Sequence, residues 1–396
     1  MAVPKLRFKR EDGTEYPEWK TNELKTIFPK IRNGFVGTVS DSFADKETGI
    51  RYIEGTNIHN GIISDDVEIY VTKAFHENHL NSQLKADDIV MVQSGHIGDC
   101  AVVGAKYAGS NCHALIIMSN GGHCDSRFYS FYFHCDSGYN KMKMYMQGNT
   151  VKHILASDMQ TFIVPIPDLE EQQKIADFHS TVDEVIAQSE AEVQNLEQQK
   201  KAAMQKIFSQ EVRFKREDGT DYSEWNKTAI SELFEISAGG DIDKANSVKE
   251  YSENYPYAVY ANALTNKGLY GYANYYKVEC DCFTVTGRGD VGYAIARHEK
   301  FVPIVRLLVC IPKHNENVDY FAEIVNYTKI LVESTGVPQL TSIQLGKIKV
   351  VYPTDTEEQQ KIADFLSAYD EAISYAKQEL DKWKELKKGL LQQMFV

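Results

Sequence analysis

The stretch EEQQKIADF, residues 170–178, is repeated letter for letter at residues 357–365, 187 positions later. Nine identical residues in a row are far beyond chance, so the chain contains an internal duplication, which has to be interpreted first. A second pair of stretches supports this: RFKREDGTEYPEW at 7–19 returns as RFKREDGTDYSEW at 213–225, an offset of 206. The two offsets differ by 19, so the chain consists of two similar halves with middles of unequal length.

Each copy of the nine-residue stretch begins a charged, helix-favouring segment without proline. Apolar or small residues recur there at steps of three and four, as in the seam of a coiled coil. We predict helices over about 169–208 and 356–395, each behind a capping box formed by Asp168 with Glu171 and by Asp355 with Glu358. About 40 residues make a rod of roughly 60 Å, whose apolar stripe needs a partner helix. The two helices are expected to pair antiparallel, with the globular segments at opposite ends.

The middles contain short runs rich in Val, Ile, Tyr and Phe, bounded by Gly, Asn and Asp, which predict strands and turns. DDIVMVQSG and FYSFYFH are such runs in the first middle, where a helix is also expected near 137–147. SGHIGDCAVV at 94–103 corresponds to RGDVGYAIAR at 288–297, so both middles should share one fold. GRGDVG at 287–292 fits a dinucleotide-binding fingerprint, but a strand-like run follows it instead of a helix, which favours a hairpin turn.

The predicted fold class is mixed α/β, with two similar globular domains separated by two long helices that pair as an antiparallel coiled coil. The short motif at the start of each half is expected to clasp its terminus onto a neighbouring domain. The expected segments are 1–20 (first short motif), 21–167 (first globular domain), 168–210 (first long helix), 211–225 (second short motif), 226–354 (second globular domain) and 355–396 (second long helix).

Composition excludes several classes of protein. A chain of 396 residues, 43% hydrophobic, can bury two or three cores, but no stretch reaches the roughly 18–20 apolar residues of a membrane span. The N-terminus lacks the apolar core of a signal peptide, so a cytoplasmic protein is expected. The net charge of −13 counts against a simple nucleic-acid binder, because DNA affinity comes from Lys and Arg.

Catalytic and metal motifs are weak. Seven cysteines without a CxxC pair do not indicate a disulfide framework, and the His-Cys pairs at 123–124 and 134–135 lack the close ligand spacing of zinc motifs. FHENH at 75–79 misses the HExxH spacing by one residue and is expected to form a surface turn. We therefore predict no catalytic residue, no metal site and no cofactor in this chain.

Several turns are dense in side chains that can contact base edges or phosphates. Gln and Asn can pair bidentately with adenine, and Arg with guanine. Each such residue is also an ordinary polar loop residue, so the signal is collective. The DNA-binding candidates are Gln93, Ser94, His96, Thr150, Lys152, His153, Asn262, Asn266, Lys267, Arg288 and Gln339.

The layout and motifs together resemble the specificity subunit of type I restriction-modification systems. The resemblance covers nearly the whole chain and rests on EQQKIADF after a hydrophobic-Pro segment in each half, on YIEGTNIHNG at 52–61, and on STGVPQL at 334–340. It implies a non-catalytic reader of double-stranded DNA, in which each globular segment is a target recognition domain for one half of a split sequence and the coiled coil sets the gap.

The resemblance also implies partners. Two modification subunits carrying S-adenosylmethionine dock on the frame and methylate adenine, and restriction subunits that use ATP and Mg can join them. We expect docking on exposed helix faces, with Gln172, Lys174, Gln359 and Lys361 as candidates. The alternative is a coiled-coil scaffold that binds two protein partners without recognising DNA, which the acidic charge supports; a self-sufficient enzyme is third.

Overall fold

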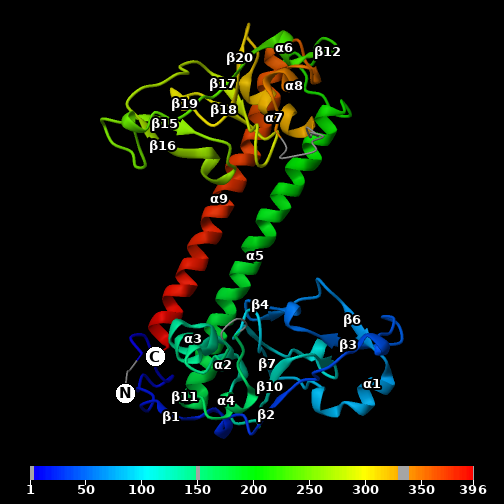
Figure 1. The fold of residues 1–396 in the computed structure, drawn as a ribbon, viewed down its shortest axis with the longest axis vertical. Coiled ribbons are helices and arrows are strands. Elements are labelled where there is room, and N and C mark those ends of the chain that lie inside the picture. Colours follow the sequence, from blue (N-terminus) through cyan, green and yellow to red (C-terminus); the bar gives the residue numbers. More distant parts are fainter. Residues whose placement is uncertain (1–3, 149–151, 329–338, 396) are drawn as a thin grey trace. The chain divides into compact units, whose positions relative to one another are not determined.

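The computed structural model describes residues 4–148, 152–328 and 339–395. The chain divides into two compact units, Met1–Glu190 with Gln378–Val396, and Ala191–Lys377. Two long helices, α5 (Leu169–Phe208) and α9 (Thr356–Met394), contribute to both units, and their predicted extents are confirmed (Figure 1). The six segment boundaries stay a prediction. None of the described helices is long and apolar enough to cross a membrane.

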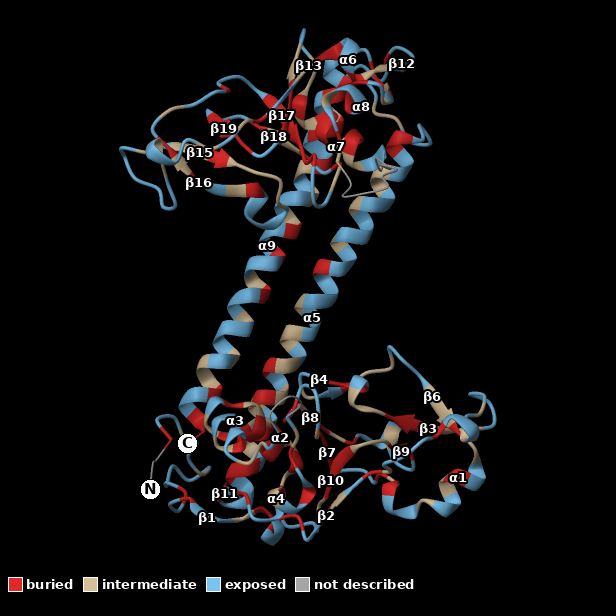
Figure 2. Cartoon of the chain, viewed as in Figure 1, coloured by how far each residue is buried: buried red, intermediate tan, exposed pale blue. Residues whose placement is uncertain are grey.

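The two helices run antiparallel within each unit, as predicted. Residues later in α5 lie beside residues earlier in α9. The buried positions of both helices lie on the sides that face each other (Figure 2). Ion pairs flank this seam, and those that are exposed to solvent each contribute little to stability. These pairs are Asp183–Lys387 and Glu190–Lys384 in the first unit, and Glu197–Lys377 and Asp370–Lys200 in the second.

The first unit is built on a four-stranded antiparallel sheet in the order β2-β10-β7-β8. Both faces of this sheet are buried: Ile89 and Met91 pack toward the helices, while Val90 and Val92 pack against Ile53 and other aliphatic side chains. A strand buried on both faces is apolar throughout, which explains the continuous run IVMV. The strands are β2 (Lys30–Asn33), β7 (Ile89–Val92), β8 (Cys100–Val102) and β10 (Leu115–Ser119).

Smaller elements complete the first unit around this sheet. One three-stranded sheet has the order β6-β3-β9, and β1 pairs with β11 beside the start of α5. The first four residues of FHENH lie in a short helix, α1, and His79 caps its C-terminus, so the expected surface turn is wrong. The bounds are β1 (Lys20–Glu23), β3 (Ile50–Ile53), β4 (Ile58–His59), β5 (Ile62–Ile63), β6 (Ile69–Val71), β9 (Asn111–Cys112), β11 (Ile163–Ile166), α1 (Lys73–Asn78), α3 (Asp136–Lys143) and α4 (Ala156–Gln160).

The strand predicted at FYSFYFH is wrong, because this run belongs to helix α2 (Ser126–His134). Asp125 caps the helix by accepting a hydrogen bond from the Arg127 N–H. Phe128 and Tyr132, four residues apart, then lie on the buried face of the helix. Aromatic content alone suggested a strand, whereas the cap and the helical spacing favour a helix. The helix expected near 137–147 is confirmed as α3, which ends at Lys143.

The second unit repeats this plan. Its central sheet has the antiparallel order β13-β20-β17-β18, matching β2-β10-β7-β8, with α7 packed on β17 and β18 (Figure 1). The shared fold of the two middles is therefore confirmed. The bounds are β12 (Asn226–Ala229), β13 (Phe234–Ala238), β14 (Ser247–Val248), β15 (Tyr257–Tyr260), β16 (Leu269–Ala273), β17 (Cys282–Val285), β18 (Ala294–Arg297), β19 (Phe301–Pro303), β20 (Leu308–Pro312), β21 (Lys349–Tyr352), α6 (Ile230–Leu233), α7 (Val318–Thr328) and α8 (Ser342–Gly346).

Candidate nucleic-acid interface

Two equivalent hairpin turns carry predicted DNA-binding residues. The β7–β8 turn holds Gln93, Ser94 and His96, and the β17–β18 turn holds Arg288. Glycines with positive φ shape both turns, a conformation that a residue with a Cβ adopts only at a cost. The prediction that GRGDVG forms a hairpin turn is confirmed, since antiparallel strands flank it.

In each unit, a second segment distant in sequence joins the turn. In the first unit, Ser94 forms an antiparallel bridge with His153, and the Ile154 N–H donates to the Gln93 carbonyl at 3.0 Å. This places the exposed Lys152 beside the turn. Thr150 lies outside the described residues.

The second unit makes the corresponding junction with different side chains. Arg288 bridges Gln339, and the Leu340 N–H donates to the Gly287 carbonyl at 2.9 Å. The Arg288 guanidinium also donates to Gln339 Oε1, at 3.3 Å from Nε and 3.1 Å from Nη2. Residues predicted from four separate places in the sequence thus form two comparable surface sites, one in each unit.

The remaining candidates of the second unit have unequal roles. Asn262 supports the turn, because its Oδ1 accepts from the Gly287 N–H at 2.7 Å and its Nδ2 donates to the Val305 carbonyl. Asn266 and Lys267 are exposed at the tip of another turn, with positive φ angles of 49° and 50°. Their side chains remain available to a ligand.

Sequence reasoning missed Arg297, which holds that tip in place. Its guanidinium lies 3.6 Å from the centroid of the Tyr260 ring and donates to the Lys267 carbonyl at 2.6 Å. The side chain also donates to Thr284 Oγ1 at 3.2 Å, and burial lowers its pKa. RGDVGYAIAR contains Arg297 as its last letter, but only the fold shows that it is buried.

A group of two histidines and one carboxylate also lies at the first unit's turn. His59, His96 and Asp99 each place one possible ligand atom within 4.8 Å of the others. The pKa of Asp99 is lowered: burial acts to raise it, but the hydrogen bond from His134 and the charges of the nearby histidines outweigh burial. The group was not predicted because His59 comes from β4 and the other two residues from the β7–β8 turn.

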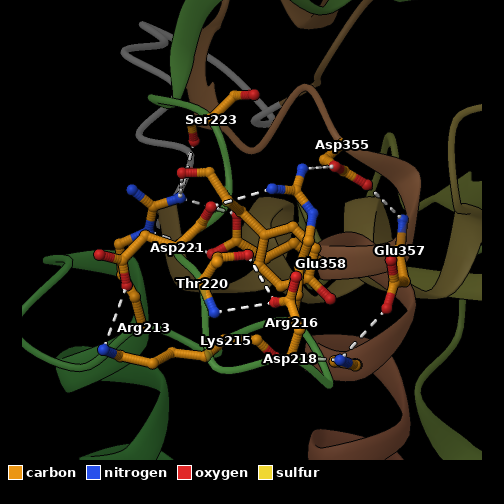
Figure 3. Close-up of polar contacts among 12 residues, drawn as sticks. Arg213, Lys215, Arg216, Asp218, Thr220, Asp221, Ser223, Asp355, Glu357 and Glu358 are labelled. Atoms are coloured by element: carbon orange, nitrogen blue, oxygen red, sulfur yellow. Dashed lines mark hydrogen bonds and ion pairs between the residues drawn. The ribbon is translucent and has the colours of Figure 1, made fainter.

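The repeated stretches meet at a buried anchor in each unit. In the second unit, Arg213 donates to both carboxylate oxygens of Glu358, at 3.1 and 2.9 Å (Figure 3). Trp225 Nε1 donates to Oε2 of the same carboxylate at 3.1 Å. The Glu358 side chain is fully buried, so its charge is stabilised by these three donors. The short motif is therefore a clasp, as predicted.

The first unit repeats this anchor with the same residue types. Arg7 donates to Glu171 at 2.9 and 2.8 Å, and Trp19 Nε1 donates at 2.9 Å. Each predicted capping box is only half formed. Neither glutamate side chain accepts a hydrogen bond from the backbone N–H of its N-cap aspartate. The first half holds: Asp168 accepts from the Glu170 N–H at 3.2 Å, and Asp355 accepts from the Glu357 N–H at 3.1 Å.

Two of the four docking candidates are buried, so their expected exposure is wrong. Gln172 donates to the Pro167 carbonyl at 3.0 Å and accepts from the Asp125 N–H at 3.1 Å. Gln359 likewise donates to the Pro353 carbonyl at 2.8 Å and accepts from the Asn317 N–H at 2.9 Å. Both glutamines join a helix start to its globular part, because buried amides require internal partners.

The two lysine candidates lie near the surface. Lys174 donates to the Lys9 carbonyl at 3.2 Å, and Lys361 donates to the Lys215 carbonyl at 3.0 Å. Each also pairs with a glutamate four residues earlier in its helix, at 3.2 Å. Both are half-buried, so the two helix starts present closely similar surfaces.

Two α/β units with one fold, equivalent turns and matching helix anchors define a duplicated protein with one candidate site in each unit. Residues 16–198 and 222–384 match the family described as type I restriction modification DNA specificity domain. The chain belongs to this family.

Full-length and partial relatives agree with this assignment. The chain is 26% identical over 431 residues to a candidate specificity subunit of the type I restriction enzyme MjaX from Methanocaldococcus jannaschii, covering 97% of this chain and 94% of that protein. It is 28% identical over 197 residues to a candidate type I specificity subunit from Mycoplasma pneumoniae. That match covers 50% of this chain and about half, 52%, of the relative.

Solved structures show the same fold. The type I restriction-modification S subunit from M. genitalium superposes with a TM-score of 0.67 at 17% identity, covering 100% of this chain and 99% of that one. A chain from a structure of the type I R-M system, solved to explain its assembly and conformational transition, gives 0.56 at 16% identity, with coverage of 96% and 98%. The predicted resemblance and fold class are confirmed.

Proposed function

We propose that this chain is the DNA sequence-specificity subunit of a type I restriction-modification complex. Its two target recognition domains, residues 21–167 and 226–354, each bind one half of a bipartite target. One observation carries the proposal: the junctions Ser94–His153 and Arg288–Gln339 have the same backbone arrangement but different side chains. Equivalent sites with different side chains suit two half-sites of different sequence.

The side chains at the junctions have the chemistry that DNA contact requires. Gln339 Oε1 holds the Arg288 guanidinium at the exposed turn, and an oriented guanidinium can pair bidentately with guanine. Lys152 supplies a positive charge beside the first turn and suits a phosphate contact. Since the whole chain carries a net charge of −13, partner subunits would supply much of the sequence-independent attraction to DNA.

In this proposal the chain itself is non-catalytic. The matched anchors Arg7–Glu171 and Arg213–Glu358 support two equivalent docking places for two copies of a modification subunit. S-adenosylmethionine would bind the modification subunits, and ATP and Mg would bind restriction subunits where these join. The paired helices would set the gap between half-sites.

Selection from randomised DNA by the complex with its modification subunit tests this proposal. We expect enrichment of two short defined elements separated by a fixed gap. Exchange of residues 226–354 for the equivalent domain of another specificity subunit should change one element only. Arg288→Ala should change preferences in that same element, whereas Lys227→Ala, an exposed cation on β12, should not. Enrichment of one continuous site, or of none, contradicts the proposal.

The net charge favours one alternative, a scaffold that binds two protein partners without DNA. A salt titration separates the two functions, because DNA affinity falls steeply as salt displaces Lys and Arg from phosphates. Partner binding that persists without any DNA affinity would favour the scaffold.

A further inference from the structure

His59, His96 and Asp99 form a cluster at the turn of the first unit that no predicted role explains as a group. The two imidazole rings stack with centroids 5.3 Å apart and an interplanar angle of 23°. One possible ligand atom from each of the three residues lies within 4.8 Å of the others. Both histidines are exposed, so an ion from solvent can reach them.

Hydrogen bonds already orient all three groups. His59 Nε2 lies 2.7 Å from the Thr56 carbonyl, and His96 Nε2 lies 3.1 Å from the Gly55 carbonyl. Because a carbonyl can only accept, Nε2 of each neutral ring carries the hydrogen and Nδ1 carries the lone pair. Metal-bound histidines in proteins are held by this same kind of bond from the second ring nitrogen.

The carboxylate is oriented by a third histidine. His134 Nε2 lies 3.1 Å from Asp99 Oδ1, and His134 Nδ1 lies 2.8 Å from the Ser130 carbonyl on the preceding helical turn. This leaves Asp99 Oδ2 as the oxygen for a metal bond. Hydrogen-bonded carboxylates are typical of metal sites, because the bond limits rotation of the ligand.

The ligand types and distances suit a zinc-like cation. Two imidazoles and one carboxylate are common zinc ligands, with bonds of about 2.0–2.2 Å, whereas Mg²⁺ and Ca²⁺ prefer oxygen ligands alone. Tetrahedral bonds of this length place ligand atoms about 3.3 Å apart. Small side-chain rotations of the exposed His59 and His96 can close the remaining distance.

We propose that His59, His96 and Asp99 form a binding site for Zn²⁺ or a similar divalent transition-metal ion, with a fourth position open to water. The ion connects the segment of Gly55–His59 to the β7–β8 turn and so fixes the turn that carries Gln93 and Ser94. His96 then acts as a metal ligand rather than as a contact to DNA.

Titration of the untagged full-length chain with ZnCl₂ in chelator-free buffer tests the site. Calorimetry should show one saturable site, and His59→Ala and His96→Ala should each weaken binding at least about tenfold, the loss typical even of residues that only orient a ligand. Asp99→Asn should weaken it as well, and MgCl₂ should give no binding. His123→Ala, which changes an exposed histidine outside the cluster, should leave zinc affinity unchanged.

An exposed thiol needs a separate control. Cys280 is a free, exposed cysteine, so the titration is repeated in Cys280→Ser, where the zinc site should persist. Cobalt substitution of the parent chain adds a readout that depends on no variant: visible d–d bands without thiolate charge transfer support the assignment. The assignment would be overturned by zinc binding no tighter than about 100 µM, or by histidine variants that both bind zinc as tightly as the parent chain. Loss of the site in Cys280→Ser, or a thiolate spectrum, would also overturn it.

Discussion

His179 is predicted to destabilise the first unit, increasingly so in acid. The side chain is fully buried in α5 among Phe131, Phe178 and Phe395. Neither ring nitrogen has a hydrogen-bond partner within the described part of the chain. The corresponding residue of the second repeat, 187 positions later, is the buried Leu366. His179→Leu therefore introduces the residue that the second repeat already has at the equivalent buried position.

The size of the effect follows from proton linkage. Burial, with a smaller contribution from the charge of Lys387, lowers the pKa of His179 from 6.5 to about 4. Below pH 6.5, His179 is protonated in the unfolded chain but stays neutral in the folded unit. Stability therefore falls as the pH drops below 6.5, and the loss is complete below about 4. A shift of about 2.5 pKa units corresponds to about 3 kcal/mol, of which about 2 kcal/mol is lost at pH 5.

Urea unfolding of the parent chain and His179→Leu at pH 7.5 and pH 5 measures this directly. At pH 7.5 the leucine variant should be more stable by about 1–3 kcal/mol, because two unpaired buried nitrogens are removed. At pH 5 its advantage should grow by about 2 kcal/mol. The matched control, Leu366→His, should introduce the same pH dependence into the second unit. An equal pH dependence of parent and His179→Leu would refute the reasoning.

Three further substitutions, with one control, test the anchors and the proposed DNA contacts. Glu358→Ala should lower the free energy of unfolding in urea by about 3 kcal/mol, because Arg213 and Trp225 lose a buried partner. As a control, Asp221→Ala removes an exposed ion pair and should lower the free energy of unfolding by less than about 1 kcal/mol. Arg288→Ala should reduce discrimination at one base of the second half-site by about 1–3 kcal/mol, measured by competition with single-base variants. Lys152→Ala should lower the slope of log affinity against log salt by about 1 without changing the selected sequence.

Regular, local patterns of the sequence were sufficient for much of the fold. The extents of α5 and α9 followed from apolar spacing and from their caps, which are properties of neighbouring residues. The turn at residues 287–292 followed from glycines between two strand-like runs. FYSFYFH shows where such patterns fail, because aromatic residues suit strands and buried helices alike until the surrounding core selects one.

Residues whose role depends on distant partners needed the structure. Glu171 fits a capping box by its spacing, but Arg7 and Trp19, more than 150 positions away, bind its carboxylate instead. Two charge-assisted bonds from Arg7 outweigh one bond to a backbone amide. The exposure expected of Gln172 failed for the same reason, since its partners belong to other segments.

The sequence by itself determined the duplication, the two long helices, the strand-rich middles and the family, because these follow from identity and from the spacing of residues near one another. Only the tertiary structure decided that Ser94 meets His153, that Arg288 meets Gln339, and that His59 lies against His96. Chain segments far apart come together through the pairing of strands and the burial of side chains. A functional site assembled in this way has no single stretch of sequence that describes it.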